Sequence, residues 1–286
     1  MADLDELRSS GASSVAALAA LAVSCASLQS TPRIIPFPTE ATGNSHRPGL
    51  ITSYRQALDA VLSVMDVRLG IPPFAGTLDL YPDRDGMAAA LEREGFQAAD
   101  ARLIADHLDG IAQPGRVLAN DAVLRWEHWP ARIAFLAHEL THVAEYALAA
   151  ARPSSADQWL REGFAEWVSW RVVDELGLSS YGMRRHVALV HLREVCDRHA
   201  LPPFSQLAAQ RGWVKGPELR AADPGYDQAF LAAELLVQLH GVEAALAYVR
   251  LHAASGDSPA NFRAAFGEDA IHFEAAFQAQ LHGALR

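Results

Sequence analysis

One stretch of the chain, Ile133 to Ala144, combines a nearly uncharged helical pattern with two histidines and one glutamate. A helix that is apolar on almost every side has to be buried. His138, Glu139 and His142 lie within this stretch, so a fold that buries the helix buries them as well. Burying two imidazoles and a carboxylate without partners costs several kcal/mol, and a divalent metal ion compensates all three groups.

The spacing of the two histidines favours a metal site. His138 and His142 are four residues apart, so on a helix both imidazoles lie on one face. In the pattern His-Glu-x-x-His the imidazoles bind zinc, and the glutamate between them, Glu139, acts as a general base without binding the metal. We expect this helix to run from Pro130, a residue favoured in the first turn, to about Ala149.

A second segment supplies a candidate third ligand. Trp159-Leu-Arg-Glu-Gly-Phe-Ala-Glu places Glu162 twenty residues after His142, on a helix expected over residues 156–175. Two imidazoles and one carboxylate form a catalytic zinc set that leaves the fourth position open. The metzincin continuation is excluded, because Glu145 and Leu148 occupy the positions where it requires Gly and His.

Together the two motifs resemble those of the gluzincins, specifically the peptidase-MA-like group related to the M1 aminopeptidases. The second element of that group reads W-L-x-E-G-x-A-E, and the resemblance covers about residues 131–241. It implies a zincin-like, thermolysin-type catalytic domain. It also implies that Glu162 is the third zinc ligand and that Glu166 hydrogen-bonds a ligand histidine. A solvated helix charge is the alternative for Glu166.

The resemblance also implies a tyrosine at the start of a later helix, which donates its phenol to the oxyanion of the tetrahedral intermediate. Tyr226 follows a Pro-Gly break and precedes an apolar helix, as this role requires. A purely structural tyrosine is the alternative. The G-A-M-E-N motif by which M1 aminopeptidases hold a free amine has no counterpart before His138, and Arg161 stands where those enzymes often have Asn.

These features predict a zinc-dependent hydrolase, specifically a metallopeptidase, with one Zn²⁺ per chain and a peptide or protein substrate. Glu139 would take a proton from the zinc-bound water and pass it to the leaving amine. Two alternatives remain: a non-catalytic zinc-binding regulatory or interaction module, and a hydrolase of non-peptide amides. The retained Glu139 argues against the first, because a structural site has no use for a base beside the metal.

The charge composition argues against one class of binding partner. The 286 residues carry a net charge of −10, and Lys and Arg form no stripe along the sequence, so nucleic acid is a poor candidate. Arg184 and Arg185 are interpreted as a solvated helix face. The oligomeric state is not predicted.

The N-terminus is ambiguous. Residues 15–28 are apolar and of signal-peptide length, but three acids precede them, so a cytoplasmic location is slightly favoured over export. No stable membrane span is predicted. The two cysteines, Cys25 and Cys196, form neither a disulfide framework nor a CxxC metal motif.

The overall expectation is a helix-rich α+β fold with a small N-terminal sheet and a helical C-terminal extension. Residues 1–50 form a leader or linker, 51–127 an α/β part, 128–241 the zinc-site helices and 242–286 C-terminal helices. Expected strands cover residues 77–81 and 115–120. Further helices are expected over residues 51–69, 86–94, 98–107, 181–198 and 227–239.

Overall fold

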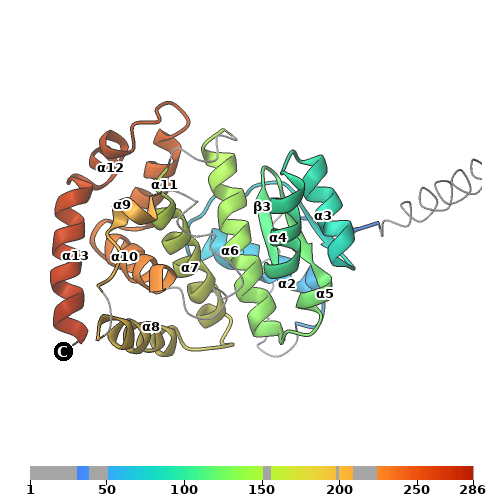
Figure 1. The fold of residues 1–286 in the computed structure, drawn as a ribbon, viewed down its shortest axis with the longest axis horizontal. Coiled ribbons are helices and arrows are strands. Elements are labelled where there is room, and N and C mark those ends of the chain that lie inside the picture. Colours follow the sequence, from blue (N-terminus) through green and yellow to red (C-terminus); the bar gives the residue numbers. More distant parts are fainter. Residues whose placement is uncertain (1–30, 39–50, 151–155, 198–199, 209–223, 286) are drawn as a thin grey trace, which may run out of the picture.

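A computed structural model describes residues 31–38, 51–150, 156–197, 200–208 and 224–285. Figure 1 shows helix α6 (Trp129–Leu148) through the middle of the molecule. The sheet and helices α3 to α5 lie on one side of α6, and helices α7 to α13 lie on the other. The expected helix-rich α+β class, with a small mixed sheet, is confirmed.

Four strands form the sheet in the order β1-β2-β4-β3. The two central strands, β2 (Thr77–Tyr81) and β4 (Arg116–Asn120), are parallel and almost entirely buried. The edge strands, β1 (Arg33–Pro36) and β3 (Gly110–Gln113), pair antiparallel with them. Gly115, with φ of 72°, occupies the left-handed region in the Pro-Gly turn between β3 and β4, which a side chain would strain.

Alternating side chains of the central strands supply two hydrophobic layers. Leu78, Leu80 and Val117 join the main core with α2 (Tyr54–Val67) and α6. Tyr81 and Leu118 point to the other face, where α3 (Arg84–Arg93) and α4 (Ala98–His107) cover them. The short helix α5 (Asp121–Leu124) follows β4 and leads into α6. The sheet therefore lies between two helical layers.

The other part of the molecule is helical. Helix α7 (Gln158–Glu175) packs between α6 and α10 (Pro224–His240). Trp159 of α7 stacks on Phe204, with ring centroids 4.1 Å apart, and on Phe273. The remaining helices are α8 (Tyr181–Cys196), α9 (Phe204–Leu207), α11 (Val242–Leu251), α12 (Ser258–Phe266) and α13 (Ala270–Leu285).

Helices α7 and α10 approach each other closely at Gly163. A Cβ atom at this position would lie 2.2 Å from the carbonyl oxygen of Ala229. Only glycine permits this contact, because backbone atoms of two packed helices cannot easily move apart. The glycine that follows Glu162 in the sequence motif therefore has a packing role, and it sets the depth at which α10 lies against α7.

Two edge strands differ from the sequence expectation. Arg33–Pro36 forms β1 within the stretch expected to be a linker, because Ile34 and Ile35 pair along β2 and an edge strand tolerates proline. Strand β3 was not predicted, since its four residues carry only one β-branched side chain. The strands expected over 77–81 and 115–120 and the helices around them are confirmed.

No single helix in the described part of the chain is long and apolar enough to cross a membrane. One helix pair, Pro224–His240 with Val242–Leu251, passes the length and composition test together but bends by 107° at its junction.

Candidate metal centre

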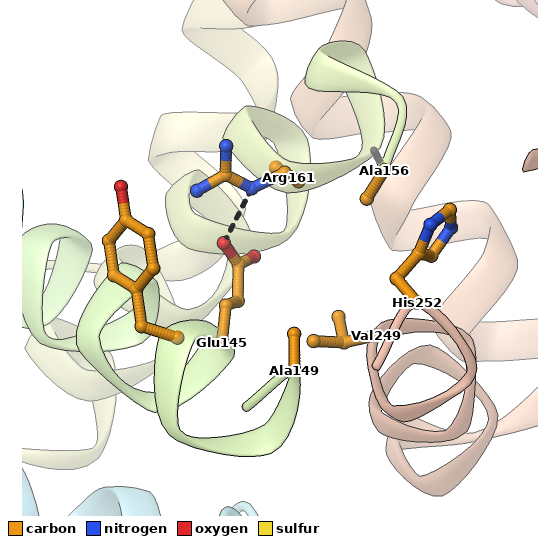
Figure 2. Close-up of a pocket in the computed structure, with 7 residues that line it drawn as sticks. Glu145, Ala149, Ala156, Arg161, Val249 and His252 are labelled. Atoms are coloured by element: carbon orange, nitrogen blue, oxygen red, sulfur yellow. Dashed lines mark hydrogen bonds and ion pairs between the residues drawn. The ribbon is translucent and has the colours of Figure 1, made fainter. Parts of the chain in front are cut away.

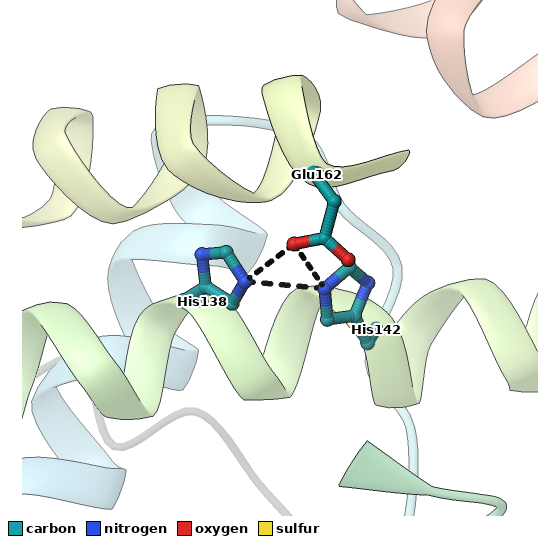
Figure 3. A group of neighbouring side chains, drawn as sticks. All are labelled: His138, His142 and Glu162. Atoms are coloured by element: carbon teal, nitrogen blue, oxygen red, sulfur yellow. Dashed lines mark hydrogen bonds and ion pairs between the residues drawn. The ribbon is translucent and has the colours of Figure 1, made fainter. Parts of the chain in front are cut away.

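Three side chains from α6 and α7 converge in the interior. His138 Nε2 and His142 Nε2 lie 3.2 Å apart. Glu162 Oε2 is 3.2 Å from the first of these nitrogens and 3.6 Å from the second. Figure 3 shows the two imidazoles rising from one face of α6 toward the carboxylate, which descends from α7. The three side chains expected to share a metal are thus neighbours.

The size of this triangle fits a small tetrahedral ion. Ligand bonds of about 2.0–2.1 Å at tetrahedral angles place ligand atoms about 3.3–3.4 Å from one another. The measured separations of 3.2, 3.2 and 3.6 Å bracket that range. Two imidazoles with one carboxylate suit zinc and other late transition metals, whereas calcium and magnesium prefer oxygen ligands. The donor set and its spacing therefore fit Zn²⁺.

Antiparallel packing of α6 and α7 brings the ligands together. Ser169 donates to the carbonyl of Ala134 near the start of α6. Arg161, eight residues earlier on α7, contacts Glu145 near the end of α6. Because the residue order runs in opposite directions on the two helices, Glu162 falls opposite the pair of histidines.

On one side of the centre, Glu166 orients the first histidine. Its Oε1 lies 3.2 Å from His138 Nδ1, one helical turn beyond Glu162. The other oxygen accepts from Trp170 Nε1 at 2.9 Å and lies 3.7 Å from the Arg184 guanidinium. A carboxylate bonded to the free nitrogen of a ligand histidine fixes the ring angle and raises its basicity. This is the position that the resemblance implies for Glu166.

On the other side, Glu145 orients the second histidine. Its Oε2 lies 2.9 Å from His142 Nδ1 and 2.9 Å from Arg161 Nε. Figure 2 shows the ion pair beside a small pocket that Val249 and His252 also line. In the sequence, Glu145 stands out only because it departs from the metzincin pattern. Its three-residue spacing from His142, on a helix with few other charges, was the available signal.

The third candidate ligand, Glu162, is also held by a neighbour. Gln158 donates its side-chain amide to Glu162 Oε1, and Arg161 donates to the amide oxygen of Gln158 at 3.2 Å. Arg161 therefore supports two ligands at once, one through Glu145 and one through Gln158. Arg161, which stands where the M1 aminopeptidases often have Asn, thus connects Glu145 and Gln158, the residues that hold His142 and Glu162.

The charges around the imidazoles favour a cation. Burial by itself lowers the pKa of His138, but hydrogen bonds to Glu162 and Glu166 outweigh it and raise that pKa well above its usual value. Burial also lowers the pKa of His142, but the carboxylates of Glu145 and Glu162 outweigh this effect and raise that pKa to about 9. Burial raises the pKa of Glu162, but the two histidines bring it well below the ordinary range. The surrounding carboxylates thus stabilise positive charge at this point.

Glu139 lies between α6 and the edge strand β3. The backbone N–H of Ala112 in β3 faces its carboxylate. Burial raises the pKa of Glu139 above its ordinary value, against the lowering influence of the two histidines and, slightly, of the Ala112 N–H. A carboxylate whose pKa moves toward neutrality is a better proton acceptor and donor near pH 7.

Two further residues belong to α8 and α10. Tyr226 lies in the first turn of α10, one turn before Ala229, which contacts Gly163 next to Glu162. Arg184 was expected on a solvated face, but it is mostly buried because Asp227 pairs with it at 2.6 Å. This arrangement brings its guanidinium to Glu166, a contact that depends on how α8 packs against α10.

Comparison with known proteins adds no family to this geometry. The chain matches no family model, no curated protein and no solved structure.

Proposed function

We propose that the protein is a zinc-dependent hydrolase and that it acts on peptide bonds. The observation that supports this most is the triangle of His138, His142 and Glu162. Glu139 lies close to these side chains without being part of the triangle. A purely structural zinc site has four protein ligands, whereas a catalytic site has three and an open position. The described residues offer three.

Each residue has a role in the proposed reaction. His138, His142 and Glu162 would hold the ion, which when bound polarises a carbonyl and lowers the pKa of water. Glu139 accepts a proton from the attacking water and returns it to the leaving amine, which contributes about a hundred- to ten-thousand-fold in rate.

The edge strand β3 favours an extended peptide as the substrate. Within the described sheet, β3 pairs only with β4, and its Ala112 N–H faces Glu139. An extended peptide adds to such an edge through main-chain hydrogen bonds, which are available in any peptide sequence. Binding along β3 would bring a scissile bond to the metal centre, because Glu139 lies beside the same strand.

Tyr226 is the proposed oxyanion donor. Its helix lies against α7 at Gly163, next to the ligand Glu162. The change Tyr226→Phe keeps the ring and removes the hydroxyl, so we expect kcat to fall about a hundred- to a thousandfold with little change in KM. Unchanged kinetics would place the donor elsewhere.

The decisive experiment measures metal content and peptide cleavage together. The wild-type chain should hold one zinc and cleave members of a peptide library. Glu139→Gln keeps the shape of the side chain and removes the base, so zinc content should persist while cleavage falls at least a hundredfold. Loss of zinc in this variant would make Glu139 a ligand. Zinc without cleavage in the wild type would favour the non-catalytic module, and cleavage of other amides alone would exclude the peptidase.

A further inference from the structure

A second site lies on the opposite edge of the sheet from the metal centre. A pocket of about 480 Å³ opens between β1, the start of α2 and the segment from α5 to the start of α6. Figure 1 shows α5 beside the lower end of α6, where this segment runs. The lining includes four arginines and a single carboxylate: Arg33, Arg55, Arg125, Arg132 and Asp121.

Backbone carbonyls and aromatic rings hold these guanidinium groups. Arg55 donates to the carbonyl of Pro36, and Arg125 donates to the carbonyls of Asp121 and Pro82. Arg132 donates to the carbonyls of Glu127 and Arg125. Neutral acceptors fix the position of a guanidinium without cancelling its charge, and each group has N–H donors left.

The ring of Tyr54 contacts two of the guanidiniums. Arg33 and Arg132 lie 5.7 and 5.8 Å from its centroid, and Arg132 also lies 4.7 Å from the centroid of Trp129. The tyrosine hydroxyl donates to Asp121 at 2.9 Å, which engages one oxygen of the only carboxylate in the lining.

No carboxylate among the described residues forms an ion pair with any of these four arginines. Nine other arginines in the same described ranges do form ion pairs: Arg68, Arg102, Arg116, Arg161, Arg171, Arg184, Arg185, Arg250 and Arg263. Grouping uncompensated like charges costs free energy, which a bound anion would recover.

Two helix N-termini add to the positive potential. Thr52 and Ser53 precede the 14-residue helix α2, and Trp129 begins the 20-residue helix α6. Both ends line the pocket. The first N–H groups of a helix lack partners within it, and the helix dipole places partial positive charge there. On α6 no side-chain cap at His128 engages these groups.

The pocket is separate from the metal centre. Trp129 precedes His138 by nine residues on α6, which is about 14 Å at roughly 1.5 Å per residue. The sheet also separates the two sites, because β1 lies beside the pocket, Glu139 lies beside β3, and these strands occupy opposite edges of the four-stranded sheet. Three strand spacings correspond to about 14 Å. A ligand in the pocket therefore does not bind the candidate metal ligands.

We propose that this pocket binds a small molecule that carries two phosphate groups. Four guanidiniums exceed what one singly charged carboxylate needs, and the planar donor fork of arginine matches phosphate oxygens. A pocket of about 480 Å³ is also larger than one inorganic phosphate requires. The proposal does not depend on the metal centre or on hydrolysis.

The test compares two probes with the same three-carbon chain by calorimetry on the full-length protein. Propane-1,3-diyl bisphosphate and glutarate place two phosphates or two carboxylates on the same three-carbon spacer, and inorganic phosphate supplies a single group. We expect the bisphosphate to bind at least tenfold more tightly than glutarate or inorganic phosphate. Equal or tighter binding of glutarate would overturn the assignment of phosphate as the preferred group. If the bisphosphate does not bind, the pocket is not a binding site for molecules of this kind.

Charge-matched variants locate the binding. Arg33→Gln with Arg55→Gln removes two exposed guanidiniums from the pocket and should weaken bisphosphate binding at least tenfold. Arg250→Gln with Arg263→Gln removes the same charge from α11 and α12 and should leave binding within twofold. Equal weakening in both pairs would show that only the net charge matters and would overturn the proposal. Unfolding midpoints and zinc content confirm that each variant is folded.

Discussion

The candidate metal centre and the arginine pocket differ in whether their arginines are paired with carboxylates. In the candidate metal centre, Arg161 and Arg184 are mostly buried, and they pair with Glu145 and Glu166, the carboxylates that contact His142 and His138. In the pocket, Arg33 and Arg55 are exposed and are held by a ring and a carbonyl. Buried charge must be paired because desolvation is costly, whereas exposed charge stays available to a ligand. The same residue type therefore supports a ligand set in one region and offers a binding surface in the other.

The change Glu162→Ala tests the buried side of this comparison most severely. It removes one of three ligand atoms, so zinc content should fall from one per chain to nearly none, and hydrolysis should fall with it. The matched control is Glu243→Ala, since that side chain is 75% exposed on α11. Metal analysis by mass spectrometry decides the result. Retention of tightly bound zinc by Glu162→Ala would remove Glu162 from the ligand set.

Two arginine variants compare how much a buried and an exposed guanidinium contribute to the free energy of unfolding. Arg161→Ala leaves the buried carboxylate of Glu145 without its guanidinium, so we expect a loss of about 3–5 kcal/mol in the free energy of unfolding. Arg55→Ala removes an exposed side chain and should change that free energy by about 0.5 kcal/mol or less. Urea denaturation of both variants checks this. Similar losses would mean that burial does not distinguish the two regions.

The two histidine supports form a comparison within the metal centre. Glu145→Gln and Glu166→Gln preserve side-chain size and remove the charge that orients His142 or His138. Each change should weaken zinc affinity about 10- to 100-fold. Competition with a chromophoric chelator measures the dissociation constants. If only Glu166→Gln weakens binding, Glu145 serves as a counter-ion for Arg161 and does not tune the metal.

Ionic strength should affect ligand affinity differently in the two regions, although this effect is smaller than those of the substitutions. Raising the salt from about 0.1 M to 1 M shortens the Debye length from about 10 Å to 3 Å and screens exposed charges more than buried ones. We expect bisphosphate affinity to fall severalfold and zinc affinity to change less than twofold. Titrations of both ligands at the two salt concentrations measure this. An equal salt response would contradict the assignment of one exposed and one buried site.

Much of the candidate centre could be predicted because its evidence is local. His138 and His142 share a helix face by their spacing alone, and the apolar flanks of α6 imply burial. The second motif indicated Glu162 on α7 through its resemblance to a family pattern, not through spacing along one helix. The supporting residues were harder to predict. Glu145 and Arg184 look like ordinary helix charges until α7 and α10 pack against their helices and remove them from water.

The sheet shows the same limit at its edges. The buried strand β2 alternates between polar and apolar residues, Thr77-Leu-Asp-Leu-Tyr, a pattern that the sequence displays directly. Edge strands are short and depend on a neighbour for their hydrogen bonds, so β1 and β3 have weak local signals. The surroundings of Glu139 depend on β3, because the N–H group of Ala112 faces its carboxylate.

Local spacing by itself determined the helices and the histidine pair, because helical periodicity converts sequence distance directly into direction. The third carboxylate was expected only from the resemblance of the second motif, and antiparallel packing of α6 and α7 places it opposite the histidines. Only the tertiary structure decided which charges pair and which remain open. Arg33 and Arg132 stand 99 positions apart in a chain without any basic stripe. They meet at Tyr54 because β1, α2 and α6 pack at one edge of the sheet, and charge density depends on distance in space.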